Sequence, residues 1–194
     1  MYRALVLLWI LLSSAPALAA LPSLSAGEKA SLDAGEVVIR DRPARQGRGV
    51  AFDAFGVIRT APSALWGVLR ECGRFQEFMP RTKKSELRKR EGNTAVCFTE
   101  IEMPFPFDNL WSEVKVSETA HGDGRFSRTW SLLRGTYEWN DGSWRLYPWG
   151  DGEMTLLVYR LAVNPKISVP DFLIRKGQTG ALPGLFEALN RRVR

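Results

Sequence analysis

The stretch GTYEWNDGSWRLYPWGDGEMTLLVYRLAV, residues 135–163, decides the fold class. Apolar and aromatic residues alternate there with polar ones, which is the two-residue period of a β-strand with one face toward a core. Two breaks that contain glycine, Asn140-Asp141-Gly142 and Gly150-Asp151-Gly152, are typical of hairpin turns. The stretch therefore predicts a pair of antiparallel hairpins with large aromatic side chains on the buried face.

The same period extends toward the N-terminus, and helical patterns flank it. We predict strands at residues 36–42, 50–59, 85–90, 94–103, 110–118, 125–133, 137–139, 143–147 and 154–163. We predict short helices at 62–73 and 75–78, and one long helix from 170 to about 192. Because a curved sheet needs a cover for its apolar face, the fold class is α+β, with the antiparallel sheet wrapped around the C-terminal helix.

The N-terminus is typical of a signal peptide. A short positive start precedes the apolar run 4–12, and Ala17-Leu18-Ala19 fits the small-x-small cleavage pattern. The alternative, an uncleaved anchor, is disfavoured because the run is far shorter than the ~20 residues that span a bilayer. We predict a signal peptide at 1–19, a lead-in at 20–35 and one domain at 36–194, in a protein that is exported to the periplasm or secreted.

Composition narrows the class of partner. A hydrophobic content of 45% and a charged content of 25% indicate an ordinary globular domain, and the net charge of +6 favours acidic partners. The basic segment 81–90 lacks the interleaved aromatics of a nucleic-acid site, so we expect a solvated face, with contact to anionic membrane as the alternative. Cys72 and Cys97 lie in apolar patterns typical of free buried thiols, and the alternative is a disulfide in an oxidising compartment.

No catalytic, metal or cofactor site is predicted. His121 is the only histidine and lies in a turn pattern, and no G-x-S-x-G, P-loop or dinucleotide-binding motif occurs. One histidine and two distant cysteines do not make the usual tetrahedral zinc site. Glu100 and Glu102 share the strand face opposite Cys97, so we interpret them as solvated rather than as an acid/base pair.

Large side chains on the inner face of a curved sheet can leave a space for a small apolar molecule, although such residues can also simply fill a core. The predicted cavity lining is Phe52, Trp130, Trp144, Leu146, Leu157, Tyr159, Phe172, Leu173, Leu182 and Leu185. Arg128 alternates in register with Trp130. If Arg128 points inward it needs an acceptor, which predicts a polar head group on the ligand; alternatively, its long side chain reaches solvent.

Two further segments suggest how a ligand enters. Phe105 and Phe107 each follow a proline, which favours an exposed loop that contacts a membrane or gates the cavity, and packing back onto the sheet is the alternative. In the C-terminal helix, Gly180 and Pro183 interrupt an apolar stripe. A hinge at these residues explains them, and so does close packing of the helix on the sheet.

Six short motifs occur in order along residues 36–192: IRTAPSALWGVL at 58–69, FQEFMP at 75–80, WSLLRG at 130–135, GSWRLYP at 142–148, TLLVYRLAVNP at 155–165, and VPDFLIR with LPGLFEAL at 169–189. Together they resemble the START-related coenzyme-Q-binding and polyketide-cyclase/dehydrase group of the helix-grip superfamily. The resemblance implies a hydrophobic cavity between the sheet and the C-terminal helix, and members that bind lipids, quinones, sterols or polyketides.

The resemblance leaves more than one function open. We expect an exported protein that binds and transfers a hydrophobic small molecule. The alternative is a cyclase/dehydrase-like enzyme that uses the same cavity, although no catalytic signature of the cyclases is found. A structural or protein-interaction role is the third possibility, and neither ligand nor oligomeric state follows from the sequence.

Overall fold

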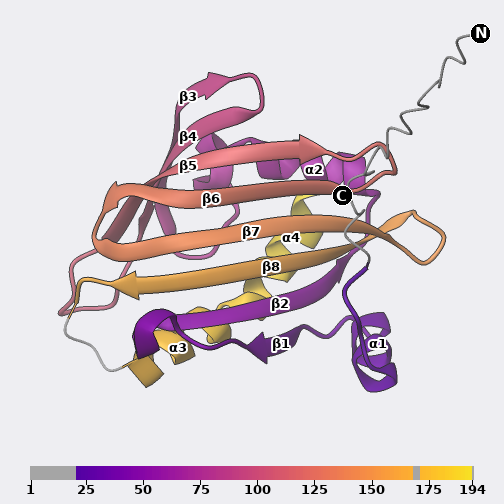
Figure 1. The fold of residues 1–194 in the computed structure, drawn as a ribbon, viewed down its shortest axis with the longest axis horizontal. Coiled ribbons are helices and arrows are strands. Elements are labelled where there is room, and N and C mark those ends of the chain that lie inside the picture. The colour runs from indigo at the N-terminus through magenta and orange to yellow at the C-terminus, as the bar shows by residue number, and fades with distance from the viewer. Residues whose placement is uncertain (1–20, 168–170, 194) are drawn as a thin grey trace, which may run out of the picture.

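The structure, a computed structural model, describes residues 21–167 and 171–193 (Figure 1). The predicted signal peptide at 1–19 lies outside the described residues. The strands are β1 (Val38–Asp41), β2 (Val50–Ile58), β3 (Thr82–Glu91), β4 (Thr94–Ile101), β5 (Leu110–Ala120), β6 (Phe126–Gly135), β7 (Tyr137–Trp149) and β8 (Met154–Pro165). The helices are α1 (Ala26–Asp33), α2 (Pro62–Arg70), α3 (Asp171–Gly180) and α4 (Leu182–Arg192), with short 3-10 helices η1 (Arg45–Gly47) and η2 (Cys72–Glu77).

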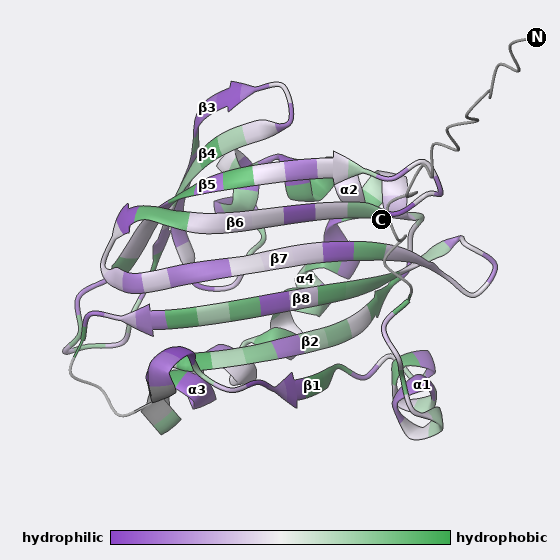
Figure 2. Cartoon of the chain, viewed as in Figure 1, coloured by the Kyte–Doolittle hydropathy of each residue, from purple (hydrophilic) through white to green (hydrophobic). Residues whose placement is uncertain are grey.

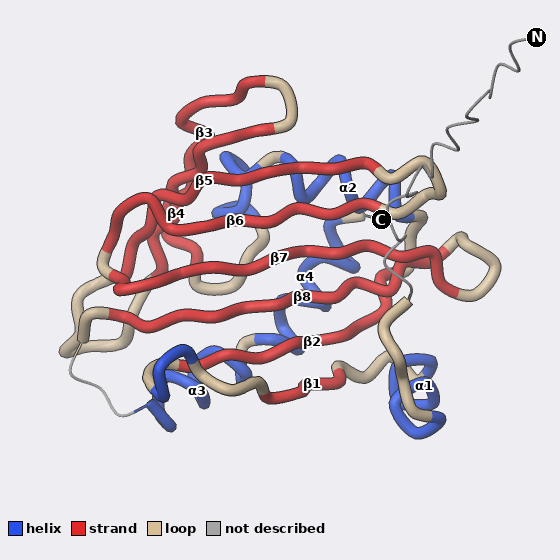
Figure 3. Tube along the Cα trace, in the orientation of Figure 1, coloured by secondary structure: helices blue, strands red, loops and turns tan. Residues whose placement is uncertain are grey.

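All the described strands form one antiparallel sheet in the order β1-β2-β8-β7-β6-β5-β4-β3. Strands β3 to β8 are a meander in which each strand pairs with the next, and the turn signals at 91–93, 121–124 and 150–152 correctly predicted three of the connections. The early strand β2 joins β8, with Phe52 opposite Leu161 and Ala54 opposite Tyr159. Figure 3 shows the result, a single layer of strands with the helices packed beside it.

The C-terminal helix covers one face of this sheet (Figure 1). Its buried side chains, among them Leu182, Leu185, Phe186 and Leu189, belong to the same apolar cluster as residues of α2, β2, β7 and β8. Figure 2 shows long hydrophobic stretches along β2 and β8, the strands that lie under the helix. The predicted α+β helix-grip fold is therefore confirmed, with the difference that the long helix is interrupted at Ala181 into α3 and α4.

The segment predicted as a lead-in contains a helix. Ser25 begins α1 with a capping box, in which its Oγ accepts from the Glu28 N–H at 3.2 Å and its own N–H donates to the Glu28 carboxylate at 2.7 Å. Leu32, 1% exposed, packs with Phe55, Tyr147, Leu156 and Val158 on the face of the sheet opposite α4. Thus α1 covers part of the outer face of the sheet.

The predicted turn at Asn140-Asp141-Gly142 does not exist, because β7 runs unbroken through it. Gly142 pairs with Trp130 on one side and Leu161 on the other. A Cβ at residue 142 would overlap the Trp130 indole and the Arg160 carbonyl, so glycine serves close packing here rather than a turn. Residues 137–165 therefore form one long hairpin, which turns at the left-handed residues Gly150 (φ +63°) and Gly152 (φ +94°).

Candidate functional site

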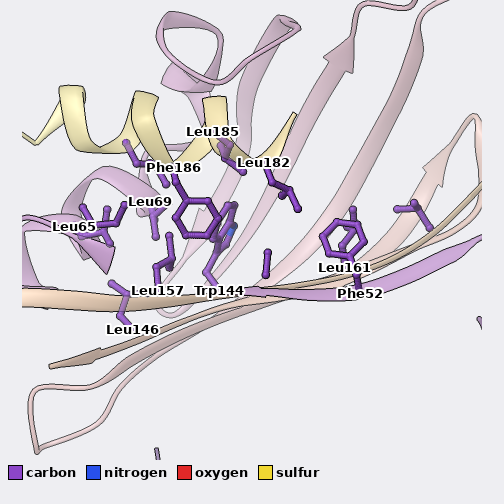
Figure 4. Packing of buried hydrophobic residues seen from close by; sticks show 14 of the residues in the cluster. Phe52, Leu65, Leu69, Trp144, Leu146, Leu157, Leu161, Leu182, Leu185 and Phe186 are labelled. Carbon is purple, nitrogen blue, oxygen red and sulfur yellow. The ribbon is translucent and has the colours of Figure 1, made fainter. Parts of the chain in front are cut away.

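A cavity of about 460 Å³ lies between the sheet and the C-terminal helices. Strands β4 to β8 supply its floor. The rest of its wall comes from α3, α4, η2, residues 79–82 before and at the start of β3, the loop between β4 and β5, and Ile167 after β8. The remaining space under α4 is filled by a tight apolar cluster that includes Leu65, Leu69, Leu146, Leu157 and Phe186 (Figure 4). The cavity thus occupies only one part of the gap between helix and sheet.

The structure brings some of the predicted lining residues together at this cavity and leaves others outside it. Trp130, Trp144, Tyr159, Leu182 and Leu185 line it. Phe52, Leu146 and Leu157 do not. Each of these three is at most 1% exposed and packs in the solid core, because helix and sheet side chains fill the gap where they lie.

The remaining two predicted lining residues belong to α3. Phe172 is 67% exposed to solvent. The side chain of Leu173 lies outside the described part of the structure. Three other residues of α3 line the cavity: Ile174, Gly177 and Gln178.

The prediction missed the part of the cavity wall that comes from β4 and β5. These side chains are Cys97, Thr99, Ile101, Leu110, Ser112, Val114 and Val116. Their two-residue spacing on each strand was visible in the sequence and could have identified them. Asn140 was missed because the false turn assigned it to a loop, and Tyr137 was missed although residues 137–139 were predicted as a strand.

Aromatic rings form one side of the cavity. The rings of Trp144 and Tyr159, paired across β7 and β8, stack with centroids 4.2 Å apart and planes 16° apart. Trp130 continues the stack at 6.0 Å from Tyr159, and its Nε1 donates to Asn140 at 3.2 Å. Burial raises the pKa values of Tyr137 and Tyr159, so both phenols keep their protons at neutral pH and can donate a hydrogen bond to a ligand.

Arg128 brings a charge to the cavity. Its side chain is 3% exposed, so it does not reach solvent, the alternative considered from the sequence. The guanidinium donates to the Leu69 carbonyl and, at 3.1 Å, to the Cys97 sulfur, while its Nε has no hydrogen-bond partner. Burial lowers the pKa of Arg128 to about 10 and outweighs the opposing effect of Glu118, yet leaves the side chain charged at neutral pH.

Glu118 lies behind Arg128 and binds two other arginines. Its carboxylate accepts from Arg90 at 2.6 Å and from Arg70 at 2.8 Å, whereas the Arg128 Nε stays 3.8 Å away. Burial raises the pKa of Glu118, but the hydrogen bonds from Arg90 and Arg70 outweigh burial and leave the pKa below its ordinary value. Three guanidinium groups from α2, β3 and β6 therefore share one carboxylate from β5.

Cys72 and Cys97 form a disulfide, so the interpretation as free thiols is wrong. The bond joins η2 to β4, and Cys97 lines the cavity. Free buried cysteines and paired ones have the same apolar sequence pattern. Only the position of η2 beside β4, which brings the two Cα atoms to 6.1 Å, distinguishes them.

The other predicted residues lie on the loop between β4 and β5 and where α3 meets α4. Phe107, 40% exposed, lines the cavity, while Phe105 on the same loop is 97% exposed. Gly180 ends α3, and Pro183 lies in the first turn of α4, where a missing N–H costs no helical hydrogen bond. The loop and α3 lie near the end of the sheet at which β8 finishes (Figure 3).

Within the described residues, no group of histidine, cysteine or acidic side chains is arranged to hold a metal ion. In the same part of the chain, no helix has the length and apolar character needed to cross a membrane. His121 lies in the β5–β6 hairpin, with its Nε2 3.0 Å from the Ser127 hydroxyl, and does not line the cavity.

A curved antiparallel sheet that holds a C-terminal helix over an internal apolar cavity defines the helix-grip class of proteins. Residues 58–190 match the family described as polyketide cyclase/dehydrase and lipid transport, and the chain belongs to this family. None of the curated proteins is a significant match to the chain.

Several solved structures share the fold. A STAR-related lipid transfer protein fragment from Xanthomonas axonopodis matches with a TM-score of 0.70 and 21% identity over 81% of this chain and 93% of that one. Human StAR-related lipid transfer protein 5 matches with a TM-score of 0.69 and 13% identity over 82% of each chain. The Zhui aromatase/cyclase from a Streptomyces species matches with a TM-score of 0.57 and 14% identity over 81% of this chain and 97% of that one. At these identities the similarity shows the fold alone.

Proposed function

We propose that the protein binds one hydrophobic small molecule, of the lipid, quinone or sterol kind, in its cavity and carries it between membranes. The observation that carries this proposal is the cavity itself, about 460 Å³ in a protein of a family that includes lipid transport. This volume is within the range of ~300–1,000 Å³ typical of small-molecule sites. Burial of each methylene contributes about 0.8 kcal/mol, so an apolar ligand gains most when it is enclosed.

We further propose that this carrier works outside the cytoplasm. The pattern of residues 1–19 supports export, and so does the disulfide between Cys72 and Cys97, because disulfides persist in oxidising compartments. Mass spectrometry of the protein from its native host tests the proposal. A mature chain beginning at Ala20 and found outside the cytoplasm is expected, and an intact chain beginning at Met1 would contradict it.

The carrier role is tested by the lipid that the protein holds and by its ability to move that lipid. Native mass spectrometry of the purified protein should find a co-purified hydrophobic molecule. A labelled form of that molecule should then pass between donor and acceptor vesicles faster with protein than without. A protein that stays empty after incubation with lipid extract would overturn the role.

A matched pair of variants connects transfer to the cavity. Gly177 lines the cavity and a side chain there would meet open space, so Gly177→Leu should narrow the cavity without disturbing the core. Gly67 is also helical and unobstructed but does not line the cavity. We expect Gly177→Leu to reduce transfer severalfold and Gly67→Leu to leave it unchanged, while both unfold at denaturant concentrations no lower than the parent.

We propose that the loop with Phe105 and Phe107 contacts the membrane during transfer. A side chain as exposed as Phe105 is a candidate for burial in a bilayer, and the net positive charge of the chain favours anionic lipid. In a liposome flotation experiment, Phe105→Ser with Phe107→Ser should bind anionic vesicles more weakly. Leu133→Ser, which removes an exposed leucine from β6, is the control. Equal binding by all three proteins would remove the loop from the membrane contact.

The second candidate function is a cyclase-like enzyme, and the phenols of Tyr137 and Tyr159 favour it because both face the cavity. With raised pKa values these groups can donate a hydrogen bond or a proton but are poor bases at neutral pH. Replacement of both tyrosines by phenylalanine distinguishes the two functions. A carrier should retain transfer within a few fold, whereas an enzyme would lose turnover of its substrate.

A further inference from the structure

Arg128 has more hydrogen-bonding capacity than the protein uses. A guanidinium offers five N–H donors. The described structure satisfies them with one backbone carbonyl, that of Leu69, and one sulfur, that of Cys97, which is a weak acceptor. Phe75 lies against the group with its ring centroid 5.5 Å from the guanidinium carbon. A buried cation with so few acceptors is costly unless something else approaches it.

The surrounding charges compensate Arg128 only in part, because its Nε lies 3.8 Å from the Glu118 carboxylate and makes no hydrogen bond. Glu118 is the nearest carboxylate, but its oxygens already accept from Arg70 and Arg90. The side chains of Arg70 and Arg90 are 39% and 26% exposed, so water can screen them. Arg128 is 3% exposed and faces the cavity instead. Of the three arginines, only Arg128 depends on what occupies the cavity.

The position of Arg128 sets the direction of a ligand. Arg128 pairs across the sheet with Trp144 on one side and Glu118 on the other, and the filled core around Leu69 and Leu146 lies next to it. Phe107, on the loop between β4 and β5, and Gly177, on α3, line the cavity and are exposed, and this loop and α3 lie near the end of the sheet at which β8 finishes (Figure 3). Between the two ends the wall is mostly apolar, and the other arginine of the lining, Arg81, is exposed, so the buried charge of Arg128 lies at the inner end of an apolar chamber.

We propose that the ligand is an amphiphile with a terminal carboxylate, bound with the carboxylate against Arg128 and the hydrocarbon toward Phe107 and Gly177. The proposal rests on the proposed carrier function and specifies its ligand. A carboxylate matches a guanidinium in geometry and carries the single charge that one buried guanidinium can neutralise. A phosphate monoester carries about −1.5 to −2 charges at neutral pH and would leave an excess of buried negative charge. A neutral ester or alcohol would accept a hydrogen bond but add no compensating charge.

The test compares ligands that share one chain and differ only in the head group. Isothermal titration of the delipidated full chain at pH 8 should use palmitic acid, methyl palmitate, hexadecyl phosphate and hexadecyltrimethylammonium. We expect the carboxylate to bind at least about tenfold more tightly than the methyl ester, as one charge-assisted hydrogen bond allows. The ammonium compound should bind most weakly. Because Arg128 is buried, this preference should persist at high ionic strength, whereas attraction by surface cations would be screened.

Three variants test whether Arg128 causes the preference for the carboxylate. Arg128→Gln keeps a hydrogen-bond donor but removes the charge, and should abolish the tenfold preference while methyl palmitate binding stays near normal. Arg128→Lys should restore part of the preference. Arg134→Gln removes an exposed arginine from the same strand and should retain the full preference. If Arg128→Gln does not fold, the comparison of head groups in the parent and in Arg128→Lys still tests the proposal.

The outcomes separate this proposal from the carrier function. If palmitate and methyl palmitate bind equally well to the parent, the carboxylate proposal is overturned and the carrier function stands. Preference for hexadecyl phosphate would also overturn the proposal, in favour of a phosphate-bearing ligand. If none of the four compounds binds, the carboxylate proposal fails, and the carrier role then depends on the co-purified molecule described above.

Discussion

Trp144 and Tyr159 are directly paired across β7 and β8, and their rings stack with centroids 4.2 Å apart. The same row continues across β6 and β5 as Arg128 and Glu118, because each of these residues also pairs directly with the next. One row of the sheet therefore carries a carboxylate, a guanidinium and two stacked rings. Since directly paired residues share a face, strand register alone brings the charge and the aromatic surface together.

Gly142 should be intolerant of any side chain. A methyl group there would meet the Trp130 indole and the Arg160 carbonyl, and backbone cannot move aside as a flexible side chain can. We expect Gly142→Ala to destabilise the fold by about 1–3 kcal/mol, as overpacking does, and to displace Trp130 into the cavity. Urea unfolding and near-UV circular dichroism measure the two effects. Gly67→Ala, where a methyl group meets open space, should be neutral or slightly stabilising, and equal stability of both variants would contradict the packing argument.

Glu118→Gln should be strongly destabilising at neutral pH. The carboxylate, 1% exposed, balances Arg70, Arg90 and Arg128, and removal of one member of a buried ion network costs about 3–5 kcal/mol. The control is Glu187→Gln, which disrupts only an exposed ion pair with Arg191 and should change the free energy of unfolding little.

The pH dependence of the same variant has a definite sign. The pKa of Glu118 in the folded protein lies below the ordinary value of 4.5, so its stabilising effect is complete above pH 4.5 and is lost as the pH falls through the folded pKa. The difference in unfolding free energy between the parent and Glu118→Gln should therefore shrink only in acid, below pH 4.5. A difference that stays constant from neutral pH to pH 3 would show that charge is not the cause.

Loss of the disulfide should lower stability without changing the sheet. The bond closes a loop with a sequence separation of 25, for which the chain-entropy model gives about 3.5 kcal/mol. Cys72→Ala with Cys97→Ala should lower the urea midpoint accordingly, and reductant should lower the midpoint of the parent but not of the double variant. Insensitivity of the parent to reductant under unfolding conditions would mean that the thiols are not paired.

The hinge between α3 and α4 stays a prediction, and the break at Ala181 makes it specific. Gly180→Ala with Pro183→Ala should extend helical hydrogen bonding across the break and stiffen the cover. We expect near-normal equilibrium binding of the ligand but slower exchange between vesicles. Stopped-flow transfer measures this rate. A folded double variant with unchanged exchange would leave close packing as the role of these residues.

The elements of the fold were predictable because they repeat a simple period. Strands β3 to β6 and β8 were predicted within a few residues, and Pro62 correctly marked the start of α2. The failure at Asn140-Asp141-Gly142 has a physical cause. Glycine has two uses, left-handed turns and close approach, and only the position of Trp130 on the neighbouring strand selects the second.

The site was predictable only in part. Alternation of polar and apolar residues identifies the inner face of a strand, but it does not show which inner side chains line the cavity and which pack in the solid core. Trp144 and Leu146 share the inner face of β7, yet one lines the cavity and the other is sealed under the helix. What separates them is the opposing layer, because Leu146 is fully buried in the apolar cluster to which Leu65 also belongs. The direction of Arg128 also depended on partners from distant segments, Leu69 and Cys97. No local pattern contains that information.

The pairing of β2 with β8 determines when the chain can finish folding. Ile58 lies opposite Thr155 and Val50 opposite Val163, so the two strands must find each other across almost the whole domain. Such non-local pairing makes folding slow, because the entropy of closing a long loop is lost before the contacts form. A nascent or truncated chain that ends before Met154 would leave β2 without this partner, with an apolar strand edge open to other chains. The pairing of β2 with β8 thus completes the sheet that encloses the ligand, and until β8 has formed the folding intermediate is prone to aggregate.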